Sequence, residues 1–496
     1  MVGSSEQGLL LEKYRERSDR FLTDLEEEIY LHFAGLKPEF ELAAIHERYR
    51  DLTSLEQALW IGERVDGDGR MRELWRFACE GFLGAVTRAD EERLATLEAG
   101  LEAEIDGEQI AFRMLGAEMA NSADRERRSR LERARCTLVD DELNPTLLDL
   151  RGRLRTATRD LGSESAVELY RRFGLPLDDL AVQCESFLSE TAEAYERALE
   201  RLLEKRLDLR LDQVARYDTP RLFRASHWDA AFPGERMLSA LKTTLAGLGI
   251  DLRSQKNVEI DIASRPSKTP RAFCAPIEVP NRIILVISPI GGPDDWRALF
   301  HEAGHTEHYA HTSPDLPFEY RRRGDDAVTE GWAFLFEGMI STPAWLERLL
   351  GEEEARELGW EGAVQKLYFV RRYCAKLLYE LELHSVTDLS EMPARYVDLQ
   401  RQATLIEPCP TDYLRDVDEG FYCTSYLRAW AFEAQVRGAL VERFGEEWFK
   451  RLEAGELLRE LWSQGQRLSA DELLQEINGS QLSLSALGGE LKEALA

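Results

Sequence analysis

The segment His301-Glu302-Ala303-Gly304-His305 contains two histidines four residues apart, with a glutamate directly after the first. On an α-helix, four residues bring the second imidazole to within about 40° of the first, one turn along, so both rings can bind one metal ion. Glu302 is then placed to polarise a metal-bound water molecule. We therefore interpret this HExxH segment as the core of a hydrolytic metal site. An exposed acidic helix with two incidental histidines is the alternative.

A third metal ligand is expected, because two histidines leave a tetrahedral catalytic site one protein ligand short. Glu330 lies 25 residues after His305, in an otherwise apolar helical stretch that Asp325 or Asp326 can cap. Burying a carboxylate there is costly unless it is paired or bound to a metal. Glu337, seven residues further on, lies about 20° from the face of Glu330 and is the expected outer partner. A solvent-facing Glu330 on an amphipathic helix is the alternative.

The helix that contains the histidines is predicted to begin at Pro293, where the two following aspartates suit the positive end of the helix dipole. Before it, six of the 17 prolines fall between residues 266 and 293, so helices cannot persist there. In and around this stretch are three β-type runs, Val258–Ile262, Arg271–Ala275 and Arg282–Ile287. We therefore predict one small antiparallel sheet, at about residues 258–287, beside the HExxH helix.

Helical periodicity dominates the rest of the chain, from Leu9 to about Tyr217 and again from Pro293 onward. The predicted fold class is mainly α, with two helical lobes around a deep active-site cleft. Residues 1–246 are expected to form a helical N-terminal lobe and residues 247–496 a catalytic lobe. The two lobes are expected to form one continuous structural unit.

Charge limits the possible partners. The chain of 496 residues has 63 Lys and Arg against 92 Asp and Glu, a net charge of −29. Such acidity argues against nucleic acid and anionic membranes, because phosphate binding needs a basic surface. No apolar run approaches the roughly 18 residues of a membrane-spanning helix, and the first twenty residues lack the features of a signal peptide. We expect a cytoplasmic protein; the sequence does not indicate its oligomeric state.

The cysteines support the same compartment. They are odd in number, scattered and without a CxxC pair, at positions 79, 136, 184, 274, 374, 409 and 423. We predict buried free thiols in a reducing compartment, forming neither a disulfide framework nor a thiolate metal site.

The run HEAGHTEH, followed by Glu330 and Glu337, resembles the thimet oligopeptidase and oligoendopeptidase F group of zinc metallopeptidases. These enzymes are gluzincins, related in fold to angiotensin-converting enzyme. The resemblance implies one Zn²⁺ held by His301, His305 and Glu330, with Glu302 as general base. It also assigns His308 and Glu337 to positions that support the site, although His308 is also compatible with simple packing.

Two further segments extend the resemblance. Residues 419–427, EGFYCTSYL, resemble the Tyr-rich segment in which a tyrosine hydroxyl donates to the developing oxyanion. Tyr426 aligns best with that role, and Tyr422 lies one turn earlier; core packing is the alternative for both. The run RIILVISPIGG resembles the edge strand that aligns the substrate backbone, with Gly291 and Gly292 allowing close approach.

The resemblance covers roughly Arg271 to Tyr426 and has two departures. The His- and Gly-rich loop that precedes the tyrosines in the family is replaced here by CPTDYLRDVDEG. Cys423 stands where the family has a tyrosine. The first 220 residues resemble the family only in being helical.

The expected function is therefore zinc-dependent hydrolysis of internal bonds in peptides of roughly 5–20 residues, because only an extended chain can pair with an edge strand. A zinc carboxypeptidase of similar fold, resembling the Taq carboxypeptidase family, is the alternative, but the HESQ and IRxxAD motifs of that family are missing. A carboxypeptidase needs a cation for the terminal carboxylate, for which Arg321 to Arg323 and Arg428 are candidates. An inactive metal-binding scaffold is the third reading, which Glu302 argues against.

Overall fold

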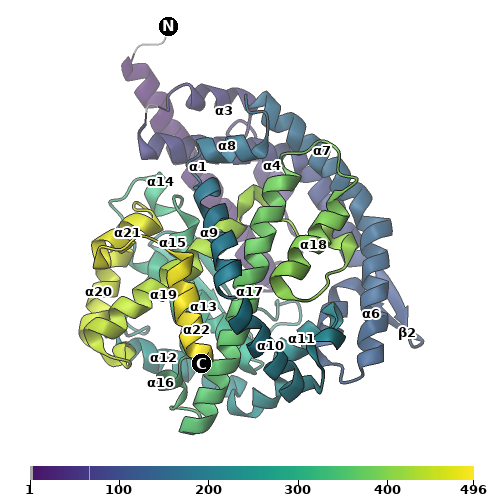
Figure 1. Cartoon of the computed structure of the whole chain (residues 1–496). Helices are drawn as coiled ribbons and strands as arrows, with labels where there is room; N and C mark the ends of the chain where they lie inside the picture. Colours follow the sequence, from purple (N-terminus) through teal and green to yellow (C-terminus); the bar gives the residue numbers. More distant parts are fainter. Residues whose placement is uncertain (1–3, 66) are drawn as a thin grey trace. The chain divides into compact units, whose positions relative to one another are not determined.

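The computed structural model describes residues 4–65 and 67–496, with side chains from residue 10 onward (Figure 1). The chain divides into two compact units, each assembled from separate stretches. Unit 1 comprises the residues up to Ala78, Ser226–Gly359 and Arg428–Ala486. Unit 2 comprises Cys79–Ala225, Trp360–Leu427 and Leu487–Ala496. This division differs from the predicted one at residue 246, because the residues up to Ala78 belong with the HExxH helix.

Unit 1 is mainly helical and contains one three-stranded sheet. Its helices are α1 (Ser4–Phe33), α2 (Leu42–Arg48), α3 (Leu55–Gly62), the start of α4 (Gly69–Gly100), α12 (Gly234–Gly247), α13 (Pro293–His311), α14 (Phe318–Arg321), α15 (Asp326–Glu337), α16 (Pro343–Leu346), most of α19 (Cys423–Phe444), α20 (Leu452–Ser463) and α21 (Ala470–Asn478). Its strands are β3 (Val258–Asp261), β4 (Phe273–Glu278) and β5 (Arg282–Val286).

The three strands lie where the sequence predicts them, but their pairing differs from the prediction. Their order is β3-β5-β4, with β5 in the centre. β4 pairs with β5 in the antiparallel sense, as expected. β3 pairs with β5 in the parallel sense, so the sheet is mixed. The local pattern of a strand does not reveal its direction relative to a neighbour, which the path of the connecting chain decides.

Helices cover both faces of this sheet. On one face, Tyr30 of α1 and Ala34, which directly follows α1, pack with alternate residues of β4 and β5, among them Ala275 and Ile284. On the other face, Ala310 of α13 belongs to a cluster with Ile283. Because β5 is buried on both sides, its sequence RIILV is a continuous apolar run without alternation. The sheet therefore supports α13 from one side.

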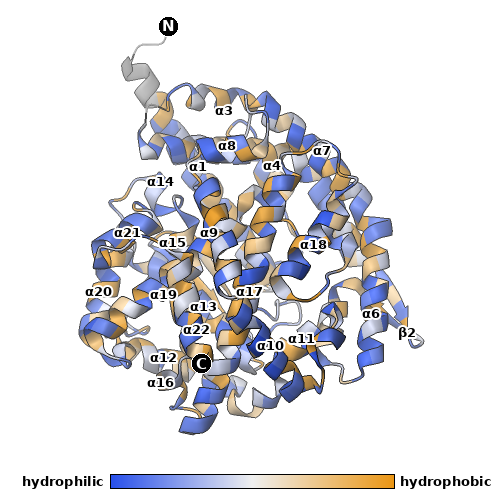
Figure 2. Ribbon diagram, in the orientation of Figure 1, coloured by the Kyte–Doolittle hydropathy of each residue, from blue (hydrophilic) through white to orange (hydrophobic). Residues whose placement is uncertain are grey.

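Unit 2 is also helical. It contains most of α4, then α5 (Leu115–Asn121), α6 (Arg125–Leu138), α7 (Asn144–Asp160), α8 (Ala166–Arg172), α9 (Leu177–Glu190), α10 (Ala192–Leu207), α11 (Thr219–Arg224), most of α17 (Glu352–Leu383), α18 (Met392–Thr404), the start of α19 and most of α22 (Leu484–Leu495). Figure 2 shows hydrophobic and hydrophilic residues on the same helices. In α9 the buried residues Leu177, Leu180, Cys184 and Phe187 recur at helical spacing, so one stripe faces the core.

A β-hairpin interrupts the helices of unit 2, where the sequence reading expected only helix. β1 (Glu102–Ile105) and β2 (Glu108–Ala111) pair in the antiparallel sense. Asp106 and Gly107 join them, both at positive φ, 56° and 83°. An Asp-Gly pair is a strong hairpin signal that was available in the sequence.

The prediction of seven free cysteines is wrong for two of them. Cys136 and Cys409, both in unit 2, are joined by a disulfide. The other five are free. The two partners are 273 residues apart, so no local pattern brings them together. A reducing compartment, which was inferred from free thiols, stays a prediction.

None of the described helices combines the length and apolar character that a membrane-spanning segment requires.

Candidate metal centre

The start of α13 is fixed by its first turn. Gly292 precedes the helix and Pro293 begins it, a position where the missing proline N–H costs nothing. The carboxylate of Asp295 accepts hydrogen bonds from the backbone N–H of Ile290 (2.9 Å) and Gly291 (2.8 Å). These contacts set where the helix begins and hence which of its residues lie on each face.

The start of α15 is held by a buried ion pair. Asp325 caps the helix, accepting from the backbone N–H of Ala327 at 3.1 Å. Arg428 binds the same carboxylate through two hydrogen bonds of 2.6 and 2.7 Å. Burial raises the pKa of Asp325, but Arg428 outweighs this and the net shift is downward. The ionised carboxylate of Asp325 therefore caps the N-terminus of α15, five residues before Glu330.

A glycine allows α13 and α15 to approach closely. A Cβ atom added at Gly304 would lie 2.5 Å from the carbonyl oxygen of Trp332 and 2.6 Å from the Cα of Ala333. Such separations are far inside van der Waals contact, so only glycine fits here. This contact brings the residues of α15 near position 330 against the histidines of α13.

Three potential ligand atoms converge between the two helices. His301 Nε2 lies 3.5 Å from Glu330 Oε2, and His305 Nε2 lies 3.7 Å from the same oxygen. All three donors lie within 4.8 Å of one another. Two ligands of a tetrahedral zinc ion, each at about 2.1 Å, are separated by roughly 3.4 Å. The spacing thus requires little rearrangement to hold such an ion.

The other nitrogen of each imidazole has its own partner. His301 Nδ1 lies 2.8 Å from Glu337 Oε2, the contact predicted from helical spacing. His305 Nδ1 lies 2.9 Å from the hydroxyl oxygen of Thr329. When Nδ1 donates in both rings, Nε2 is left with a lone pair directed toward Glu330. Such outer hydrogen bonds fix the tautomer and orientation of metal-binding histidines.

Glu302 is held by the sheet. Its Oε2 accepts a hydrogen bond of 2.9 Å from the backbone N–H of Cys274 in β4. Burial raises the pKa of Glu302 to about 7, against the lowering effect of His301. Burial lowers the pKa of His301, but hydrogen bonds to Glu330 and Glu337 outweigh it and raise the pKa to about 10. Burial lowers the pKa of His305 to about 4.

These residues fit a catalytic zinc ion by the chemistry of their donors. Two imidazoles and one carboxylate are a usual set of three protein ligands, which leaves a fourth position open. The side chains of His301 and His305 keep 18% and 13% of their surface exposed, so a small ligand can reach them. Glu302 lies on the same helix but is not one of the three converging donors.

His308 is outside this group. It is fully buried, and its Nε2 lies 3.3 Å from the carbonyl oxygen of Gly465. Its ring stacks on Tyr309. His308 therefore packs α13 against the turn after α20, and the role that the resemblance assigns to it beside the metal has no contact to support it.

The predicted substrate strand is corrected. β5 is the central strand, paired on both sides, and cannot align a peptide along a free edge. The backbone N–H of Gly291 donates to Asp295, and that of Gly292 donates to the carbonyl of Phe232 at 2.8 Å. Both glycines have positive φ, 111° and 89°. They shape the turn before α13, where their N–H groups are engaged, and their role in binding substrate stays a prediction.

Tyr422 and Tyr426 belong to unit 2. Their rings lie 5.2 Å apart, edge to face, and Tyr426 also contacts Tyr373 at 5.5 Å. Their assignment as oxyanion donors stays a prediction.

Sequence reasoning missed three supporting residues. Thr329 directly precedes Glu330, and a hydroxyl beside a ligand was a usable signal. Gly304 lies inside the histidine segment, where a glycine in a helix hints at close packing. No feature of the sequence indicated the role of Cys274, because this residue contacts Glu302 through its backbone N–H and lies in β4, far from Glu302 in the chain.

Two other groups of metal-donor side chains lie in unit 2. One consists of Glu380, Asp418 and Cys423. The other consists of Glu132 and the two disulfide-bonded cysteines, whose sulfurs are already engaged.

In comparisons with known proteins, no family model matches the chain, and no curated protein matches its sequence.

Proposed function

We propose that this chain is a zinc-dependent metallopeptidase that hydrolyses internal bonds of short peptides. The observation that supports it most is the convergence of His301 Nε2, His305 Nε2 and Glu330 Oε2, with Nδ1 of each ring already bonded elsewhere. A bound zinc ion would supply Lewis acidity to polarise a carbonyl and acidify water. The ordered outer partners, Glu337 and Thr329, are what such a site needs to keep its ligands aligned.

Glu302 is the proposed general base. Its side chain is half-buried, and only one of its oxygens accepts from the Cys274 N–H. The other oxygen remains to take the proton of the attacking water and pass it to the departing amine. The proposed oxyanion donor is Tyr426, with Tyr422 as the alternative, and this assignment rests on the family resemblance.

The contacts of three of the four candidate arginines, Arg321, Arg322 and Arg428, support an endopeptidase over a carboxypeptidase. Arg428 is committed to Asp325 and Asp471. Arg321 binds Asp19, and Arg322 binds Asp19 and the carbonyl of Pro276. These guanidinium groups already have carboxylate partners within unit 1, so they are poorly suited to recognising a substrate terminus.

Mass spectrometry of peptide products tests this proposal. The zinc-loaded protein would be incubated with peptides of graded length, each with a free or an amidated C-terminus. We expect internal cleavage that amidation leaves unchanged, and no cleavage by Glu302→Gln. Stepwise loss of C-terminal residues that amidation abolishes would establish the carboxypeptidase alternative. Absence of any hydrolysis, with zinc bound, would leave only the metal-binding scaffold.

A further inference from the structure

Helix α7 in unit 2 has three arginines on one face. Arg151, Arg155 and Arg159 follow one another at intervals of four residues. Like charges at this spacing repel one another and destabilise a helix. A negative charge close to the three arginines would reduce this repulsion.

The partners of these arginines leave positive charge uncompensated. Arg155 donates to two backbone carbonyls, Val386 at 2.7 Å and Thr387 at 3.2 Å, which carry no net charge. The exposed side chain of Arg159 makes no hydrogen bond or ion pair with any residue the structure describes. Arg151 has one ionic partner, the mostly exposed Glu419, at 3.2 Å.

Arg151 is the most unusual of the three. Only 7% of its side chain is exposed. Its Nε and Nη1 atoms are buried and have no hydrogen-bond partner among the described residues. Burying a guanidinium with unsatisfied donors lowers the stability of the folded protein. The arrangement therefore suggests a ligand that supplies the missing acceptors.

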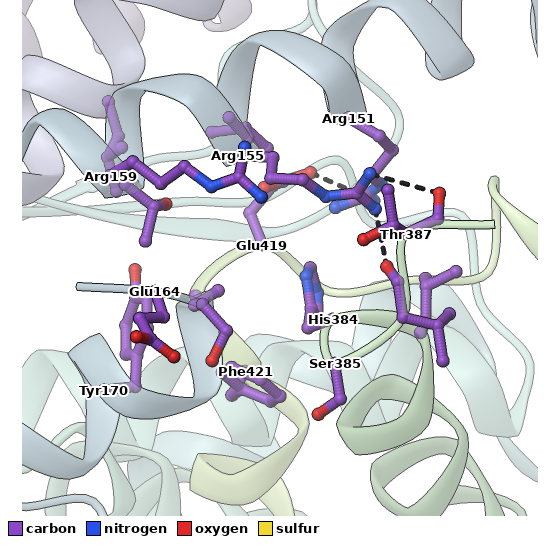
Figure 3. Close-up of a pocket in the computed structure, with 18 of the residues that line it drawn as sticks. Arg151, Arg155, Arg159, Glu164, Tyr170, His384, Ser385, Thr387, Glu419 and Phe421 are labelled. Carbon is purple, nitrogen blue, oxygen red and sulfur yellow. Dashed lines mark hydrogen bonds and ion pairs between the residues drawn. The ribbon is translucent and has the colours of Figure 1, made fainter. Parts of the chain in front are cut away.

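The arginines line a pocket with about 80 Å³ of space, enough for a small anionic group (Figure 3). In Figure 3 they lie in a row on one side, with His384, Phe421 and Tyr170 on the other. Apolar walls come from Leu83, Leu154, Leu383, Val386, Leu389 and Phe421. Two acids, Glu164 and Glu419, also line the pocket.

We propose that this pocket binds a small molecule through a phosphate or carboxylate group, with an apolar portion against the leucine and phenylalanine walls. Arginine forks bind both kinds of oxyanion through paired, charge-assisted hydrogen bonds. Binding would turn the Arg151 guanidinium so that its Nε and Nη1, which have almost no accessible surface here, donate to the ligand oxygens together with Arg159. The exposed Glu419 is free to turn toward solvent as the anion enters.

His384 is affected by the positive charge of the pocket. Burial and the charges of Arg151 and Arg155 lower its pKa to about 3. The imidazole is therefore neutral at physiological pH and can donate a hydrogen bond to the ligand without adding charge. This site uses only residues of unit 2 and does not depend on the proposed peptidase activity.

Calorimetric titration of the full-length, zinc-loaded protein tests the proposal. The probes are phenyl phosphate and benzoate, with benzyl alcohol as the uncharged control, in a low-chloride buffer at neutral pH. We expect saturable one-to-one binding of an anion but not of the alcohol. The tighter of the two anions identifies the group that the site prefers.

Two variants with the same change of charge locate the binding. Arg159→Met should weaken it by about tenfold or more, the typical loss for a charge-assisted contact. Arg133→Met, an exposed arginine of α6 outside the pocket, should leave it unchanged. Arg151→Met should abolish binding in a protein that still melts cooperatively; if that variant unfolds, Arg159→Met decides.

His301→Ala separates this site from the metal centre, because anions also bind zinc. Binding should persist in this variant, whatever becomes of its activity. No saturable binding of either anion, equal losses in Arg159→Met and Arg133→Met, or loss of binding in His301→Ala would each overturn the proposal.

Discussion

Each unit contains a group of three side chains of metal-binding type. In unit 1, the Glu330 carboxylate faces the Nε2 atoms of His301 and His305. In unit 2, the donor atoms of Glu380, Asp418 and Cys423 also lie within 4.8 Å of one another. These side chains, however, already form hydrogen bonds and ion pairs with one another and with a lysine. Lys376 Nζ binds Asp418 at 2.6 Å. The Cys423 thiol donates to Glu380 at 3.2 Å.

The difference shows that proximity of donor types does not make a metal site. In unit 1, a metal has only to replace the proton that His301 holds beside Glu330, and the three donors include neither a lysine nor a thiol. A metal in unit 2 would have to displace the Lys376 ammonium and deprotonate Cys423, whose thiol pKa is raised by burial and by Glu380. Burial also raises the pKa of Glu380 to about 8, which keeps it protonated near neutrality. We therefore interpret the unit 2 group as structural.

The largest effect is expected at the proposed base. Glu302→Gln keeps the shape and the hydrogen bond from Cys274 but cannot accept the proton. Peptide hydrolysis should fall by roughly 10²–10⁴, while bound zinc stays at the wild-type level. Asp294→Asn, an exposed acid on the same helix, is the control and should retain full activity. Normal turnover in Glu302→Gln would remove the residue from the mechanism.

Lys376→Met tests the structural interpretation of the second group. Only 5% of the Lys376 side chain is exposed. Its loss leaves neighbouring carboxylates without their cation, which we expect to destabilise the protein by about 3 kcal/mol in chemical denaturation. Zinc content should not change. A stability equal to wild type would mean that the lysine does not neutralise the group.

Gly304→Ala probes the contact that assembles the unit 1 site. The added methyl overlaps the backbone of α15, so we expect a loss of about 1–3 kcal/mol in unfolding free energy and weaker zinc binding. Gly152→Ala is the matched control, a helical glycine of α7 with no atom within 4 Å of an added Cβ. It should stabilise the protein by about 0.5–1 kcal/mol. Equal effects of the two substitutions would contradict the close helix contact.

Thr329→Val removes the hydroxyl beside His305 Nδ1 and nearly preserves side-chain volume. Zinc affinity, measured by competition with a chelator, should fall by roughly 10–100-fold. Thr243→Val, at an exposed hydroxyl of α12 that bonds the carbonyl of Ser239, should leave the affinity unchanged. Unchanged affinity in Thr329→Val would show that His305 needs no outer partner.

The parts of the site that follow from helical spacing could be predicted from sequence. His301 and His305 share a face because they are four residues apart, and Glu337 is close to that face by the same arithmetic applied to Glu330. The contacts of Cys274 with Glu302, and of Gly304 with α15, join distant segments, so no local pattern contains them.

In the fold, too, features that depend on contacts between distant segments could not be predicted from local sequence. The apolar run of β5 revealed a buried strand, but its identification as an edge strand failed, because strand order is a property of the whole sheet. The parallel pairing of β3 and the bond between Cys136 and Cys409 likewise depend on how separated segments meet. The Asp106-Gly107 hairpin is different, since its signal was local and was outweighed by the surrounding helical periodicity.

Elemental analysis of purified variants tests the central claim most directly. Wild-type protein, loaded with zinc and then dialysed, should hold one zinc ion per chain. His301→Ala should hold less than about half an equivalent, because two remaining ligands bind zinc weakly. Glu380→Gln should hold as much as wild type. Zinc that persists in His301→Ala, or that is lost in Glu380→Gln, would contradict the assignment of the metal centre to His301, His305 and Glu330.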